Sequence, residues 1–327
     1  MPRIARYRPH ARRAMTERKA HLDTLAVCCL LLCCVLWGLN HVATKVTLAE
    51  IPPLMQASTR SLGAAVLVTL WARMRNIPLS ERDGTLTGGL LAGALFAAEF
   101  ACIFCGLQFT TASRMVVFIY LAPFVVALGM PFIARSERLT ASQLAGLVAA
   151  FGGVASAFAE GFHAPAAGPQ QLLGDGLGVC AALLWGATTL VIRGTRLSAA
   201  VAEKTLLYQL AVSGVLLGLG SVFAGEPVPA RLTAASLVPL TFQTVVITFA
   251  SYLLWFWLMR HYPATPLASF TLLTPIAGLL AGALLLREPI TLRLVIALVA
   301  VAAGIAVVNR PSSRTVRSVV KPRPYAA

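Results

Sequence analysis

The sequence predicts an all-α membrane protein of ten transmembrane helices, arranged as two inverted five-helix repeats around a central cavity. Hydrophobic residues make up 58% of the 327-residue chain and charged residues only 12%, against roughly 25% charged residues in soluble domains. At ~20 apolar residues per span, the chain has room for about ten spans. Trp37-Gly38 followed by Lys45 also recurs, at the same spacing, as Trp185-Gly186 followed by Arg193.

The apolar stretches give the order of the elements. The first repeat is expected at residues 24–159, with spans at 24–46, 53–72, 87–107, 112–134 and 141–159. The second repeat is expected at residues 174–309, with spans at 174–193, 203–224, 234–258, 263–286 and 290–309. An outer linker at 160–173 joins the repeats, and basic tails at 1–23 and 310–327 flank them.

The basic residues predict the orientation. With a cytoplasmic N-terminus, the outer side receives five of the 27 Lys and Arg residues, Arg60 lies within a span, and the rest fall inside. This bias predicts that both termini are cytoplasmic. The basic tails indicate contact with anionic lipid, and no nucleic-acid-binding motif accompanies them. Five spans per half make the repeats inverted, because Trp37 then lies on a helix that runs outward and Trp185 on one that runs inward.

A proline stands in the middle of the fourth span and another in the middle of the ninth. Pro123 and Pro275 each fall about 15 Å deep, counting ~1.5 Å per residue. Each leaves the carbonyl four residues earlier, that of Ile119 or Thr271, without its helical hydrogen bond. A tolerated kink is one interpretation. The matched placement favours the other, in which both prolines are hinges beside the cavity.

Two charged residues lie deep within the predicted spans. Arg60 in the second span and Glu99 in the third reach a similar depth. One interpretation is a salt bridge that only fixes packing. The other is a charge pair in the cavity that binds an amphoteric substrate or exchanges a proton. Glu99 and His41 are the candidates for proton coupling, although a lone histidine near an interface is more often structural.

A polar stripe follows the eighth span. Helical spacings of three and four put Thr241, Thr244, Thr248, Ser251, Tyr252 and Trp255 on one face. Such a face turns toward protein or water, so we interpret it as cavity lining; the alternative is hydroxyls that bond back to their own helix. The full set of cavity candidates is Trp37, Asn40, Arg60, Glu99, Tyr120, Trp185, Thr248, Ser251, Tyr252 and Trp255.

Other chemistry has little support in the sequence. The seven cysteines lie in apolar stretches without ligand partners and are expected to be packing residues. We find no metal-ligand pattern, phosphate-binding loop or nucleophile elbow, so neither an enzyme nor a cofactor is predicted. The pairs Gly89/Gly93, Gly214/Gly218 and Gly278/Gly282 predict helix packing inside the chain rather than a dimer interface; the oligomeric state stays open.

Over about residues 24–309 the chain resembles the EamA branch of the drug/metabolite transporter superfamily. The repetition in order carries the resemblance: Trp37-Gly38 with Lys45, Arg60 after Pro53, Pro123 with Glu137, Trp185-Gly186 with Arg193, and Pro275 with Glu288-Pro289. It implies two inverted five-helix repeats, cytoplasmic tails and alternating access without nucleotide hydrolysis. It also implies export of amino acids, related metabolites or drugs across bacterial inner membranes. Glu99 and the polar stripe are not part of it.

We therefore expect a secondary transporter of the inner membrane that exports small organic metabolites, such as amino acids or amphipathic compounds. Its partners would be a small-molecule substrate, the lipid bilayer and protons, without a nucleic acid. One alternative is an importer or facilitator of the same solutes. Another is a membrane interaction or sensor protein, which predicts no solvent-filled cavity between the halves.

Overall fold

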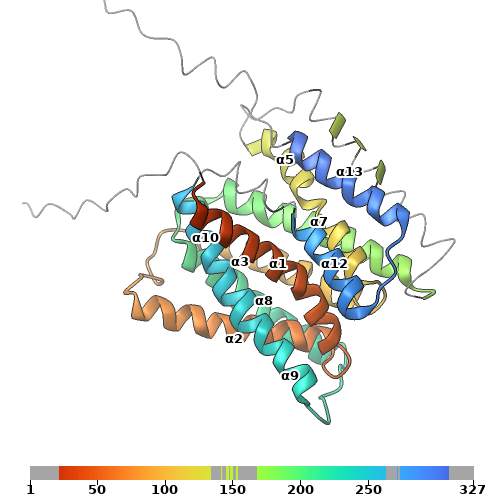
Figure 1. The fold of residues 1–327 in the computed structure, drawn as a ribbon. Coiled ribbons are helices and arrows are strands. Elements are labelled where there is room, and N and C mark those ends of the chain that lie inside the picture. The colour runs from red at the N-terminus through yellow and green to blue at the C-terminus, as the bar shows by residue number, and fades with distance from the viewer. Residues whose placement is uncertain are drawn as a thin grey trace, which may run out of the picture.

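The computed structural model describes residues 22–133, 168–262, 271 and 273–308, with scattered positions between 141 and 153. Within these ranges every regular element is a helix (Figure 1). The first half contains α1 (Thr24–Thr47), α2 (Pro53–Met74), α3 (Leu86–Gly106), α4 (Ala112–Ile119) and α5 (Ala122–Ile133). The second half contains α7 (Gln171–Gly194), α8 (Ala202–Phe223), α9 (Ala234–Thr241), the π-helix η2 (Phe242–Ser251), α10 (Tyr252–His261), α12 (Leu273–Leu286) and α13 (Leu292–Val308).

Among the described residues, six helical stretches are long and apolar enough to cross a membrane: Thr24–Thr47, Leu86–Gly106, Ala112–Ile133, Gln171–Gly194, Ala202–Phe223 and Ala234–Leu258. They confirm the prediction of a multi-pass, all-helical membrane protein. Most of the predicted fifth span, the start of the ninth span and Glu137 fall outside the described residues. The count of ten spans, the repeat boundaries and the side of the termini therefore stay predictions.

The fourth predicted span is broken at Pro123. Tyr120 and Leu121 form a turn between α4 and α5, in which the Leu121 N–H donates to the Phe118 carbonyl at 3.1 Å. Because proline has no N–H, the Ile119 carbonyl lacks its helical donor, as the sequence predicts. Pro275 is the third residue of α12, and residues 263–270, before that helix, lie outside the described ranges.

The α-helical periodicity that we expected along the eighth span is wrong over residues 242–251. This stretch is a π-helix, and the Thr248 hydroxyl donates to the Gln243 carbonyl five residues earlier at 2.8 Å. A π-helix has i→i+5 hydrogen bonds, but Thr248 and Ser251 of the predicted stripe are buried in it, together with Gln243 and Ile247. Gln243 is fully buried, whereas Thr241 is exposed.

Helices from the two halves pack against one another. The most extensive pairs are α3 with α7, α2 with α8, α3 with α8, and α1 with α12, and Figure 1 shows α1 alongside α12. The predicted glycine pairs lie in these seams. A Cβ on Gly93 would lie 2.5 Å from the Val212 Cβ, and one on Gly214 would lie 2.6 Å from a Leu62 methyl carbon. These contacts confirm that the glycines serve packing inside the chain.

Candidate functional site

Arg60, on α2, is a fully buried cation. Its side chain has an exposed fraction of 0%, and its guanidinium carbon lies 4.0 Å from the Phe100 ring centroid and 5.1 Å from that of Phe104. None of its three nitrogens has a hydrogen-bond partner within the described ranges. Aromatic faces stabilise a desolvated cation by about 2 kcal/mol, less than the several kcal/mol that burying it costs. Arg60 is therefore a buried cation whose hydrogen-bonding groups the described side chains do not satisfy.

Glu99, on α3, is the second buried charge. It is 5% exposed, and its Oε2 atom has no hydrogen-bond partner among the described residues. Arg60, Glu99 and Tyr252 are close enough to interact electrostatically. No hydrogen bond or ion pair joins Arg60 to Glu99, so the packing salt bridge that the sequence allows is not formed. Neither charge faces lipid, since both are buried.

Further polar atoms on α1 and α2 are buried without a partner in the described part of the chain. They are the Asn40 Oδ1, His41 Nδ1, Gln56 Oε1 and Ser61 Oγ atoms. His41 is near enough to Arg60 for their charges to interact. Buried polar atoms without a partner are rare in native proteins and usually contact ordered water or a ligand. The three helices therefore present a polar site that their own side chains do not satisfy.

Trp37 joins α1 to the eighth predicted span. Its indole N–H donates to the Ser251 hydroxyl at 2.9 Å. Its ring meets Tyr252 and Trp255 edge to face, with centroid separations of 6.5 and 5.4 Å. Ser251 is also held by its own helix, because its hydroxyl donates to the Ile247 carbonyl at 2.6 Å. The structure thus brings together four of the cavity candidates.

The remaining candidates occupy two other places. Tyr120 and Trp185 form an edge-to-face pair 5.9 Å apart, and Trp185 packs between the two large apolar clusters of the bundle. Thr248 is fully buried, with its hydroxyl bonded within η2. For Thr248 the structure shows the back-bonding alternative rather than a free lining hydroxyl.

Sequence reasoning missed a polar cluster around Gln243. Its side-chain oxygen accepts hydrogen bonds from the Thr44 hydroxyl and from the Gln56 amide, both at 3.2 Å. Its amide donates to the Thr47 hydroxyl at 3.3 Å. The available signal was a pair of glutamines inside otherwise apolar spans, which must find partners when water is absent. This cluster ties α1, α2 and η2 together near the C-terminal end of α1.

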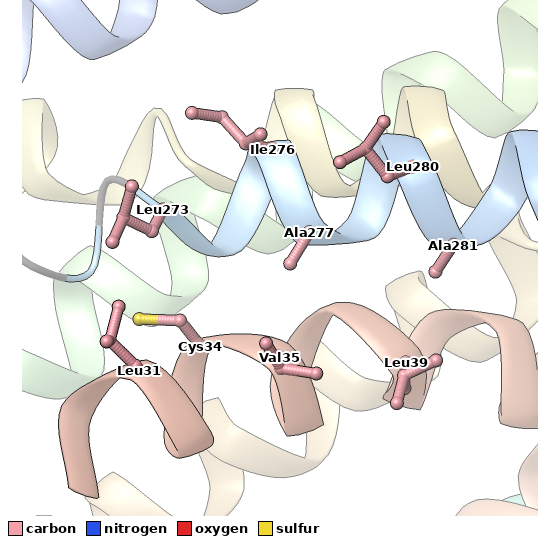
Figure 2. A pocket seen from close by; sticks show the side chains of 9 residues that line it. All are labelled: Leu31, Cys34, Val35, Leu39, Leu273, Ile276, Ala277, Leu280 and Ala281. Carbon is pink, nitrogen blue, oxygen red and sulfur yellow. The ribbon is translucent and has the colours of Figure 1, made fainter. Parts of the chain in front are cut away.

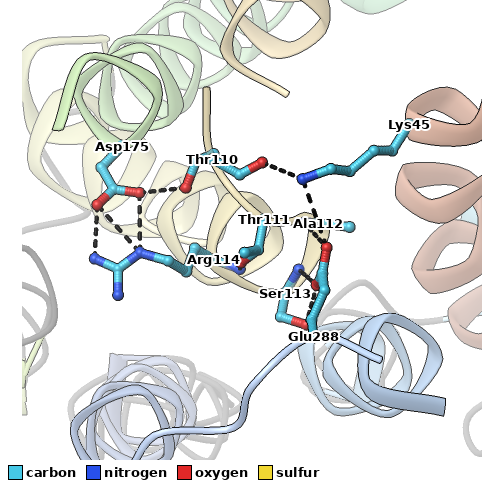
Figure 3. Close-up of polar contacts among 8 residues, drawn as sticks. All are labelled: Lys45, Thr110, Thr111, Ala112, Ser113, Arg114, Asp175 and Glu288. Carbon is cyan, nitrogen blue, oxygen red and sulfur yellow. Dashed lines mark hydrogen bonds and ion pairs between the residues drawn. The ribbon is translucent and has the colours of Figure 1, made fainter. Parts of the chain in front are cut away.

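A second missed network lies beside it (Figure 3). The Lys45 ammonium group donates to the Thr110 carbonyl at 2.6 Å and lies 3.7 Å from the Glu288 carboxylate. Lys45 therefore does not simply extend into solvent. Arg114 and Asp175 form a buried ion pair at 2.6 Å, and the Thr110 hydroxyl donates to the same aspartate at 2.6 Å. These bonds connect α1, α7 and the start of α4.

An apolar groove runs between α1 and α12 (Figure 2). Its volume is about 320 Å³, and its lining residues are Leu31, Cys34, Val35, Leu39, Leu273, Ile276, Ala277, Leu280 and Ala281. It contains none of the predicted cavity residues. The groove and the Arg60 site are therefore separate features of the bundle, and the groove has the apolar character of a surface toward lipid.

The chain is similar to known proteins over most of its length. The family model described as the EamA-like transporter family matches residues 24–159 and 172–310. An uncharacterized protein of Pseudomonas aeruginosa is 30% identical over 254 residues, covering 77% of this chain and 82% of its own length. An uncharacterized transporter of Bacillus subtilis, YvbV, is 26% identical, with coverage of 85% and 89%.

A named relative and a solved structure extend the comparison. A probable amino-acid metabolite efflux pump of Escherichia coli is 27% identical over 270 residues, covering 80% of this chain and 87% of its own length. A solved structure described as "Crystal structure of protein" superposes with a TM-score of 0.61 at 18% identity, covering 88% of this chain and 98% of that one. At that identity the likeness shows a shared fold.

Proposed function

Because the chain belongs to the EamA-like transporter family, we propose that it is a secondary transporter that exports small organic metabolites across the inner membrane. We assign to it ten transmembrane helices in two inverted repeats, both termini in the cytoplasm, and alternating access to a central cavity. Relatives in Escherichia coli and Salmonella typhimurium carry the name of probable amino-acid metabolite efflux pump. These names support amino acids and related metabolites as the substrate class.

Reciprocal contacts of the two Trp-Gly motifs support a two-fold relation between the repeats. Gly38 packs against α12, the helix that contains Pro275, and a Cβ at residue 38 would lie 2.6 Å from a backbone nitrogen of that helix. Gly186 packs against α5, the helix that contains Pro123, with a Cβ placed 2.5 Å from the Val125 Cβ. Each motif therefore contacts the proline helix of the opposite half, as a pseudo-two-fold axis requires.

The unsatisfied charges of Arg60 and Glu99 are the observation that carries the substrate assignment. A substrate carboxylate would bind the guanidinium group, and a substrate ammonium group or a proton would bind the free carboxylate oxygen. Trp37, Tyr252 and Trp255 would contact the apolar part of the substrate. An amphoteric solute satisfies both charges at once, whereas a purely apolar one leaves them unpaired.

In the transport cycle Pro123 and Pro275 act as hinges, and Glu99 with His41 supplies the proton-coupling groups. The break between α4 and α5 at Pro123 supports this role, since a helix without one hydrogen bond bends there at lower cost. Passive import of the same solutes is the competing direction of flow. Passive import requires no pH gradient, so the dependence of flux on a pH gradient distinguishes it from proton-coupled export.

Transport by the purified protein in proteoliposomes tests the proposal. Labelled amino acids and their metabolites are loaded on one side, a pH jump is applied, and flux is measured for wild type, Arg60→Gln, Glu99→Gln and the exposed control Glu81→Gln. We expect flux in wild type and Glu81→Gln, and strong loss in the other two variants. Equal flux in all four would overturn the assigned site. Flux without a pH gradient at the same rate would favour the facilitator.

A further inference from the structure

Three carboxylates at one end of the bundle each bind the start of a helix in the opposite half. Glu288 accepts hydrogen bonds from the Ala112 and Ser113 N–H groups, at 2.8 and 2.9 Å, at the start of α4. Glu226 accepts from the Leu54 and Met55 N–H groups, at 3.0 and 2.9 Å, at the start of α2.

The third carboxylate crosses in the other direction. Glu50, which follows α1, accepts hydrogen bonds from the N–H group of Thr233 at 2.8 Å, at the start of α9. The Thr233 and Ser236 hydroxyls also donate to it. Helix N-termini carry free N–H groups and a partial positive charge, so carboxylates there make strong bonds.

All three carboxylates lie at the same end. Lys45, in the last turn of α1, contacts Glu288, and Glu50 follows it by five positions. Leu54 and Met55, which Glu226 binds, begin the next helix. Lys45 additionally neutralises Glu288 and binds the Thr110 carbonyl, just before α4. The end is thus tied across the halves at α2, α4 and α9.

The opposite end is built differently. The shift in numbering that carries Trp37 onto Trp185 also carries Thr85 onto Thr233, and Glu50 onto Ser198. At this end the bonds are local: the Thr85 N–H group and the Thr85 hydroxyl both donate to the carboxylate of Asp83, two residues earlier. Ser198 cannot replace Glu50 as a charged acceptor.

A further feature of this end is the seam between α3 and α7 beside Ser198. It holds a pocket of about 640 Å³ lined by Gly84, Thr87, Gly88, Leu91, Gly194, Thr195, Arg196 and Ser198. Cross-half ties at this end that involve a carboxylate include the ion pair of Lys204 with Asp83, at 2.9 Å, and the hydrogen bond that the Tyr262 hydroxyl donates to Asp23, at 2.9 Å. In the described part of the chain, the carboxylates that bind helix N-termini across the halves lie at the Glu50 end.

We propose that Glu50, Glu226 and Glu288 form a latch that keeps their end of the transporter closed, and that this end opens by releasing the N-termini of α9, α2 and α4 together. The inference rests on the proposed function, because a latch has a role only in a protein that opens at both ends. It assigns the closed end of this structure to the Glu50 side.

Site-directed labelling tests the latch without measuring transport. All seven native cysteines are replaced, Ser251→Cys is introduced as the reporter, and an impermeant maleimide is applied to vesicles of either sidedness. The combined variant Glu50→Gln, Glu226→Gln and Glu288→Gln keeps the side-chain size but removes the charges. We expect its labelling from the Glu50 side to rise at least about tenfold, and its labelling from the Asp83 side to fall. The control Asp83→Asn should shift labelling the opposite way.

Unchanged labelling in the combined variant would overturn the latch. If that variant does not fold, Glu50→Cys with Thr233→Cys provides a second test, since a disulfide formed with copper phenanthroline should block labelling from the Glu50 side until a reductant is added. Labelling that persists in the cross-linked protein would equally overturn it. Side-dependent labelling without solute flux would contradict the proposed function alone, whereas flux with unchanged labelling would contradict the latch alone.

Discussion

Gly38 of α1 lies against the backbone of Gly278 in α12, and a Cβ on residue 38 would come within 2.6 Å of the Gly278 nitrogen. Such an approach permits no side chain at residue 38, and it sets the crossing point of two helices that come from different halves. Trp37, the preceding residue, donates to Ser251. The glycine therefore places the indole group as well as the helix.

Gly38→Ala should destabilise the protein. The added methyl group meets backbone atoms that cannot rotate away, so we expect a loss of about 1–3 kcal/mol, as for overpacked cores. Thermal unfolding in detergent measures this. Gly176→Ala is the matched control, because a Cβ there meets nothing within 4 Å and alanine favours the helix. Equal melting temperatures for the two variants would show that α1 and α12 are less closely packed.

Arg60→Met should stabilise the protein while it stops transport. Removing a buried charge that lacks a partner removes a desolvation cost, and methionine fills most of the volume. The expected result is a higher melting temperature and flux near background. Arg114→Met is the control, since its guanidinium group is paired with Asp175; leaving that aspartate unpaired should cost about 3–5 kcal/mol. A fall in the melting temperature of Arg60→Met would mean that Arg60 has a partner.

Trp37→Phe and Ser251→Ala should have overlapping effects. Each removes the same hydrogen bond, which is worth about 1 kcal/mol. The loss of stability in the double variant should therefore be smaller than the sum of the two single losses, by about the energy of that hydrogen bond. A double-mutant cycle on the free energy of unfolding measures this difference. Thr69→Val serves as a control outside this contact, because its hydroxyl donates to its own helix at Ala65. Strict additivity would show that the indole N–H does not depend on Ser251.

The general architecture follows from composition and repetition. The low charge content and the length of the apolar stretches predict membrane-spanning helices, and the order of the Trp-Gly and proline motifs predicts the transporter family. Both predictions depend on the average chemistry of many residues, so local errors do not change them. The break at Pro123 is also predictable, because the missing N–H of proline acts locally.

The site was harder to predict, for identifiable reasons. The π-helix at 242–251 could not be predicted, because nothing in a pattern of threonines distinguishes i→i+5 from i→i+4 bonding. Depth counting places Arg60 and Glu99 at one level but gives no angle around the helix axis, so it cannot tell a salt bridge from two unpaired charges. The carboxylate contacts of Glu50, Glu226 and Glu288 join segments far apart in sequence and leave no local signal.

Glu50 and Asp83, at opposite ends of the bundle, should not contribute to the pH dependence of transport near neutrality. The Thr85 hydroxyl and the Lys204 ammonium group hold the pKa of Asp83 well below its ordinary value of 3.8. The Ser236 and Thr233 hydroxyls likewise lower the pKa of Glu50 below its ordinary value of 4.5. A lowered folded-state pKa means that each tie is fully present above the ordinary pKa and is lost only as the pH falls through the lowered one.

Flux measured from about pH 5 to about pH 8 checks this, because both ties are complete throughout that window. Asp83→Asn and Glu50→Gln should change the rate while keeping the wild-type shape of the profile. Glu99→Gln should change the shape, if the carboxylate exchanges the coupling proton. The reverse pattern, with an unaltered profile in Glu99→Gln and an altered one in Glu50→Gln, would move proton coupling from the buried site to the end of the bundle.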